Sequence, residues 1–228
     1  MNPLIYTSVP VAAVLAGATF AVLKKPGPAF VSAIQHLAAG VVFAAAAVEI
    51  LPQIMHSASV LATFVGGTLG VVAMLSIKSL ERRWQGPVGL LTTIGIDILI
   101  DGLVLGLAFL AGAKAGLLLT FALTLEVLFL GLTVTNALRQ SIRSRFRIVA
   151  LSGGLALLLP LGTLMAVPVA LLPASVIAGF LTFGLIALLY LVTEELLVEA
   201  HEQLDSPLIS AMFFIGFLAL LLIEEVIG

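Results

Sequence analysis

Long apolar stretches separated by short polar links cover almost the whole chain. A membrane-spanning helix needs about 20 consecutive, mainly apolar residues. Charged residues, together with proline and glycine, divide the chain into eight stretches of this kind. We expect helices over residues 4–23, 29–51, 58–77, 88–110, 116–138, 148–169, 174–197 and 208–226. The pattern therefore predicts an all-α integral membrane protein that crosses the lipid bilayer of a cell membrane eight times.

The composition agrees with this interpretation. Of the 228 residues, 61% are hydrophobic and 10% are charged, and the mean hydropathy is +1.27. Soluble domains are about 45–50% apolar and about 25% charged. The net charge of −2 does not bear on a nucleic-acid partner, but the chain has no basic run long enough to bind a polyanion, and none is expected. The chain has no cysteine, which excludes disulfides, thiolate metal sites and cysteine nucleophiles.

The basic residues are distributed unevenly among the links. Nine of the ten lie in the links after the first, third and fifth stretches. They are Lys24, Lys25, Lys78, Arg82, Arg83, Arg139, Arg143, Arg145 and Arg147. The tenth, Lys114, lies in a link of the opposite set. Because cytoplasmic links carry an excess of Lys and Arg, we expect these three links in the cytoplasm and both chain termini outside it.

Three acidic residues lie near the middle of apolar stretches. Asp97 and Asp101 belong to the fourth stretch and Glu126 to the fifth. A charged side chain at the centre of a bilayer costs about 2.5–3.5 kcal/mol, and no Lys or Arg lies at matching depth. The spacing of four residues places Asp97 and Asp101 on one face of a helix.

The fourth and fifth stretches can be aligned on a Gly-Leu pair that both contain. Asp97 then corresponds to Glu126, and Asp101 corresponds to Leu130. A short turn joins the two stretches, so we expect antiparallel neighbours whose three carboxylates converge. Hard divalent cations prefer such oxygen ligands. The alternatives are a proton relay and neutral carboxylic acids that are hydrogen-bonded to the backbone.

A second polar cluster lies at the cytoplasmic end of the seventh stretch: Glu194, Glu195, Glu199, His201 and Glu202. Helical spacing places Glu195, Glu199 and Glu202 on one face. The same spacing places His201 beside Glu194. We interpret the cluster as a relay for a metal ion. The alternative is an ordinary helix end whose charges face water.

A short internal similarity suggests a repeat. The segment Glu49-Ile-Leu-Pro closes the second stretch and resembles Glu195-Leu-Leu-Val in the seventh. The two segments cross the membrane in opposite directions, which is typical of an inverted repeat. We expect one transmembrane domain over residues 1–228, with three-span repeats at 1–77 and 148–228 around a central helix pair at 88–138.

Residues 36–52 (HLAAGVVFAAAAVEILP) resemble the second span of the ZIP family of divalent metal transporters. Residues 183–201 resemble the seventh span of that family, and residues 159–162 (LPLG) resemble its sixth-span motif. The resemblance implies a ZIP-like 3+2+3 inverted-repeat bundle and a homodimer. It also implies an elevator-like movement of spans one, four, five and six against the other four.

The chain departs from the family pattern at the metal site. Asp97 stands where the fourth-span signature has histidine, and Asp101 stands at its glutamate. Glu126 occupies the first polar position of span five, whereas Leu130 and Leu159 replace glutamates of spans five and six. The binuclear site of the family is therefore incomplete, and the three carboxylates are left to form one site. Because imidazole is absent, we expect weaker selectivity for Zn²⁺ relative to Mn²⁺, Fe²⁺ or Mg²⁺.

Taken with the residues themselves, the resemblance predicts transmembrane transport of a divalent cation such as Zn²⁺, Fe²⁺ or Mn²⁺. The ion is the substrate, and no other cofactor is expected. A proton-coupled carrier, or a metal sensor of the same fold that no longer transports, is the alternative. We do not expect an enzyme. The Glu194-Glu195 pair resembles that of CAAX-type membrane proteases, but Glu199 stands where those enzymes need an arginine.

Overall fold

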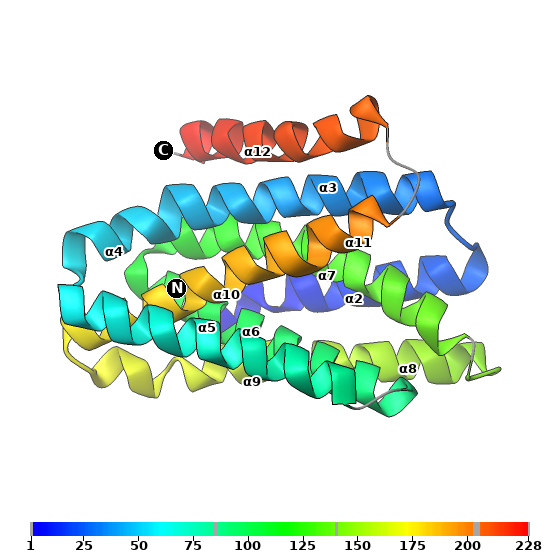
Figure 1. The fold of residues 1–228 in the computed structure, drawn as a ribbon, viewed down its shortest axis with the longest axis horizontal. Helices are drawn as coiled ribbons and strands as arrows, with labels where there is room; N and C mark the ends of the chain where they lie inside the picture. The colour runs from blue at the N-terminus through cyan, green and yellow to red at the C-terminus, as the bar shows by residue number, and fades with distance from the viewer. Residues whose placement is uncertain (1, 84–85, 140, 203–205, 228) are drawn as a thin grey trace.

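Helices make up all the secondary structure of the described chain. The computed structural model describes residues 2–83, 86–139, 141–202 and 206–227, and no β-strand occurs in these ranges. Within them, eight helical segments are long and apolar enough to cross a membrane (Figure 1). They are Pro3–Leu23, Pro28–Ser57, Val60–Leu80, Val88–Ala111, Ala113–Leu138, Arg145–Leu171, Ala174–His201 and Pro207–Ile227. The expected all-α, multi-pass membrane architecture is confirmed.

Several of these segments are built from more than one helix. The first two segments contain α1 (Pro3–Tyr6), α2 (Ser8–Leu23), α3 (Pro28–Ala45), η1 (Ala46–Ile50) and α4 (Leu51–Ser57). The next three are the single helices α5 (Val60–Arg83), α6 (Pro87–Ala111) and α7 (Ala113–Leu138). The last three contain α8 (Arg145–Ala156), α9 (Leu158–Met165), η2 (Pro168–Leu171), α10 (Ala174–Tyr190), η3 (Leu191–Leu196), α11 (Leu197–His201) and α12 (Pro207–Ile227).

A wide π-helical turn interrupts the second and the seventh segments. These turns are η1 and η3, and in η1 the N–H of Leu51 donates to the carbonyl of Ala46, five residues back. Pro52 then falls in the first turn of α4, where a missing N–H is tolerated. The helix therefore continues to Ser57, and the expected end at residue 51 is wrong.

The two ends of the bundle differ in chemistry. Both chain termini lie toward the left in Figure 1, and the links α2–α3, α5–α6 and α7–α8 lie at the right. These three links and the adjoining helix ends carry nine of the ten basic residues. We call this side the basic end and the opposite side the terminal end. At the terminal end, Lys114 Nζ forms an ion pair with Glu224 Oε1 at 2.5 Å, which joins α7 to α12.

Two helix crossings beside the centre of the bundle depend on glycine. Where α2 crosses α7, a Cβ atom on Gly17 would lie 2.2 Å from the Leu128 oxygen, and one on Gly131 would lie 2.5 Å from the Val14 oxygen. Both distances are too short for any side chain. The backbones therefore approach closely only because both positions are glycine.

The crossing of α6 and α9 is built in the same way. A Cβ atom on Gly102 would lie 2.0 Å from the Leu159 oxygen, and one on Gly162 would lie 2.0 Å from the Leu99 oxygen. Thr163 Oγ1 reinforces the crossing, because it donates to the Gly102 carbonyl at 2.9 Å. This contact fixes the part of α6 that carries the mid-helix aspartates.

Candidate metal centre

Three carboxylates from two antiparallel helices meet inside the bundle. Asp97 and Asp101 lie one turn apart on α6, and Glu126 lies on α7 beyond a turn at Gly112. One oxygen of each carboxylate lies within 4.8 Å of the others. The structure thus brings together the three mid-membrane acids that the sequence singled out.

Two of these carboxylates are almost fully buried. The exposed fraction is 3% for Asp101 and 2% for Glu126. Asp101 Oδ2 and Glu126 Oε2 have no hydrogen-bond partner within the described part of the chain. Burial of an unpaired polar group costs free energy, and burial of an unpaired charge costs more. A cation or bound protons must therefore compensate the cluster.

The donor set suits one hard divalent cation. Oxygen ligands lie about 2.0–2.6 Å from Zn²⁺, Mg²⁺ or Ca²⁺, so two ligand oxygens of one ion lie at most about 4–5 Å apart. The 4.8 Å limit of the cluster lies within that range. Small side-chain adjustments would place the three oxygens around a common centre.

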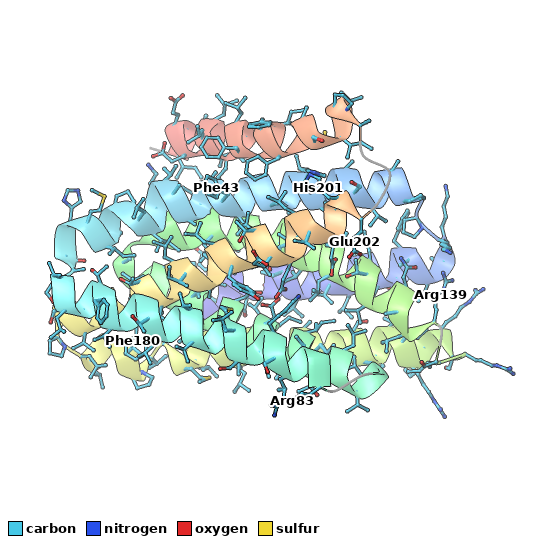
Figure 2. All side chains as sticks on the ribbon, viewed as in Figure 1. Phe43, Arg83, Arg139, Phe180, His201 and Glu202 are labelled. Carbon is cyan, nitrogen blue, oxygen red and sulfur yellow. The ribbon has the colours of Figure 1, made fainter. Side chains whose placement is uncertain are left out.

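A cavity of about 340 Å³ leads from the carboxylates toward the basic end. We call it the vestibule. Its acidic lining residues are Asp97, Glu126, Glu194, Glu195, Glu199 and Glu202. Asp101 is not among these lining residues. Glu202 is labelled in Figure 2 at the right-hand side of the bundle, the side of Arg139. The four glutamates of the second sequence cluster therefore lie on the path between the centre and the basic end.

His201 lies outside the vestibule, unlike the neighbouring glutamates. Its Nδ1 contacts the Leu197 carbonyl at 2.5 Å, and its ring lies 5.0 Å from the ring of buried His36. Regular helical spacing places His201 beside Glu194. The π-helical turn η3 changes the register between them, so Glu194 lines the cavity and His201 does not.

The polar contacts beside His201 hold α11 against α3. Ser32 Oγ donates to the Ala200 carbonyl at 2.9 Å, and Gln35 Nε2 donates to Glu199 Oε2 at 2.8 Å. The ring contact with His201 places His36 in the same interface between α3 and α11. The bond from Gln35 also orients Glu199, which lines the vestibule.

Apolar residues occupy the positions where the family resemblance implies two further glutamates. Leu130 lines the vestibule. Leu159 is buried, and its carbonyl faces Gly102. Neither side chain can ligate a metal, so the described residues offer one three-carboxylate site at this depth.

The sequence reasoning missed one charged residue of the vestibule. Lys78, near the end of α5, lines the cavity together with the six carboxylates. The sequence pattern identifies it only as part of a basic link. The glycines Gly66 and Gly70 could have indicated its position, because they press α5 against α10, the helix that leads into Glu194.

Comparisons with protein-family models and with curated proteins give no match to this chain. The functional interpretation therefore depends on the residues and on the geometry of the centre.

Proposed function

We propose that the chain transports a divalent metal cation through the centre formed by Asp97, Asp101 and Glu126, as a divergent ZIP-like carrier. The observation that carries this proposal is the convergence of three carboxylates with two unpartnered buried oxygens. A divalent ion would neutralise most of their charge and satisfy those oxygens. A mid-membrane cluster without a basic partner at its depth marks an ion pathway more often than a structural element.

The vestibule supports a route for the ion. Its glutamates line the cavity between the centre and the basic end, among apolar residues. An ion that leaves the centre would exchange one set of oxygen ligands for the next and regain water stepwise. The basic end would face the cytoplasm, because Lys and Arg accumulate on that side of membrane proteins.

A ZIP-like inverted repeat is supported by the matching crossings. Gly17 corresponds to Gly162 by a shift of 145 residues, and Gly131 corresponds to Gly102 by a shift of 29. In both crossings each glycine faces the carbonyl three residues before the other glycine. The shift of 29 is also the one that relates Asp97 to Glu126.

The π-helical turns add a second correspondence between the halves. Glu49 lies in η1 and Glu195 lies in η3, which gives a shift of 146 residues. Such turns are rare and occur frequently at functional sites. Two rare turns at matched glutamates favour a common ancestry of the first and last three spans.

Uptake into proteoliposomes tests the transport proposal. Mn²⁺, Fe²⁺ and Zn²⁺ should enter vesicles that contain the wild-type chain. Asp101→Asn and Glu126→Gln should reduce uptake to the level of empty vesicles, because each removes a ligand charge but keeps the side-chain shape. Glu225→Gln, an exposed acid near the C-terminus, serves as the matched control.

The outcomes separate the alternatives. Equal uptake by all four proteins would remove the centre from the pathway. Metal binding without uptake would favour a sensor. A proton flux that persists without metal and is lost in the same two variants would favour a proton-coupled carrier.

A further inference from the structure

Lys78 has an unusual position for a lysine at a membrane boundary. It is half-buried on α5 and lines the vestibule. Among the described residues that form this cavity, Lys78 carries the one basic side chain, against six carboxylates. The other basic side chains that the structure describes at this end contribute no part of the lining. The charge of Lys78 therefore acts on the carboxylates of the vestibule, although Lys78 is also one of the basic residues of the links.

The packing of α5 fixes the base of this side chain. A Cβ atom on Gly70 would lie 2.9 Å from Ile186 Cβ and 3.1 Å from the Phe183 oxygen, so α5 and α10 touch closely there. Lys78 follows Gly70 by eight residues, which is about two helical turns. Its anchor is rigid, whereas the four-carbon stem of a lysine lets its ammonium group move among several carboxylates.

We propose that Lys78 is a tethered competitor cation that makes the vestibule select divalent over monovalent ions. This inference rests on the proposed transport function. A tethered group acts at an effective concentration of about millimolar or more, so the ammonium is always present near the glutamates. A K⁺ ion that displaces it exchanges one unit charge for another, with little electrostatic gain.

A divalent ion that displaces the ammonium doubles the Coulomb attraction to the same carboxylates. Lys78 therefore weakens the binding of every cation to the vestibule. Only for monovalent ions does it remove most of the electrostatic gain of binding. Monovalent ions are far more abundant than free transition metals in any cell. The lysine keeps them from filling an acidic cavity that would otherwise attract them.

The test compares Lys78→Gln with the wild type at one ionic strength. Mn²⁺ binding to the full-length chain in detergent is measured by electron paramagnetic resonance, with Mn²⁺ uptake by proteoliposomes in parallel. The salt is either K⁺ or a bulky organic cation at about 0.15 M, so that screening is the same in both. In the bulky cation, Lys78→Gln should bind Mn²⁺ about three- to tenfold more tightly, because one repulsive charge is lost.

The decisive readout is competition by K⁺. Exchange of the bulky cation for K⁺ should leave wild-type binding nearly unchanged and should weaken Mn²⁺ binding to Lys78→Gln several-fold. Lys78→Arg should behave as wild type, because it keeps the charge. Lys25→Gln, which removes an exposed charge of the same end outside the cavity, should also behave as wild type.

Failure of this inference is distinguishable from failure of the transport proposal. A wild type that neither binds nor takes up Mn²⁺ would overturn both. A wild type that transports Mn²⁺, with no change in affinity or in K⁺ sensitivity for Lys78→Gln, would overturn the role of Lys78 alone. An equal change in Lys25→Gln would also overturn that role, because general surface charge would then explain the effect.

Discussion

The two halves of the bundle on either side of the carboxylate centre differ in the side chains that they contain. Toward the basic end lies a cavity of about 340 Å³ whose walls carry six carboxylates and one lysine. Toward the terminal end, the same helices α6 and α7 pack apolar side chains with almost no exposure. These include Val104, Leu105, Ala108, Ala122 and Leu123. The centre is therefore open to the basic end and closed toward the terminal end. We call the packed apolar side chains of α6 and α7 on that side the seal.

If the proposed transport function holds, this difference would let one site serve two sides of a membrane in turn. Polar walls admit water and ions, and packed apolar walls exclude them. A carrier needs the second arrangement to be reversible, so the seal must hold by contacts that a movement of helices can break. A water-soluble reagent should therefore reach residues of the vestibule readily and residues of the seal only rarely.

The largest expected contrast is in solvent access. Because the chain has no cysteine, single cysteines can be introduced without background. Thr93→Cys lies in the vestibule, and Ala108→Cys lies in the seal, where Ala108 is fully buried. A water-soluble thiol reagent should modify the first about 1,000-fold faster, because the second reacts only after an opening that costs about 4 kcal/mol.

Mass spectrometry of the solubilised protein over time measures both rates. The contrast would be refuted by similar rates in native protein. Denatured protein is the control, and both cysteines should then react equally.

The next effect concerns how tightly the seal is packed. A Cβ atom on Gly106 would lie 2.5 Å from Ala166 Cβ and 2.9 Å from the Thr163 oxygen. Gly106→Ala should therefore destabilise the protein by about 1–3 kcal/mol, visible as a lower midpoint in a thermal unfolding assay. Gly154→Ala is the matched control, because nothing lies within 4 Å of that position. An unchanged midpoint for Gly106→Ala would show that the neighbouring residues at the end of α9 shift to make room for the added methyl group.

A smaller effect is expected from adding a ligand to the vestibule side. Leu130 lines the cavity one turn from Glu126, so Leu130→Glu would place a fourth carboxylate near the centre. Mn²⁺ affinity should rise about tenfold, which corresponds to about 1.4 kcal/mol. Leu130→Gln has the same shape without the charge and should leave the affinity unchanged. Equal affinities in all three proteins would mean that the side chain does not reach the ion.

The helices and the centre could be predicted from the sequence, because both depend on short-range patterns. Apolar runs define the spans, and the four-residue spacing of Asp97 and Asp101 fixes their common face. The π-helical turns could not be predicted, because the segment Ala46–Ile50 (AAVEI) carries no signal for a wide turn. The position of His201 outside the vestibule could not be predicted either, because it depends on the π-helical turn η3. The position of Lys78 at the vestibule depends on how α5 packs against α10, a long-range contact that local pattern does not determine.

The smallest expected effect tests whether the ion pair at the terminal end helps to close the seal. Lys114 Nζ and Glu224 Oε1 lie 2.5 Å apart, and Glu49 lies close enough for its charge to act on Lys114. The two paired side chains remain 36% and 26% exposed, so solvent screening limits the pair to about 0.2–1 kcal/mol. Lys114→Gln should therefore increase the modification rate of Ala108→Cys by at most about fivefold.

A charge swap separates the ion pair from simple loss of packing. The double variant Lys114→Glu with Glu224→Lys keeps an attractive pair between α7 and α12, so the rate at Ala108→Cys should return toward the wild-type value. The rate at Thr93→Cys should not change in any of these proteins, because the vestibule is already open. A rise at both cysteines would indicate general loosening of the bundle. A rise confined to Ala108→Cys would show that the ion pair holds the terminal end closed and does not hold the rest of the bundle together.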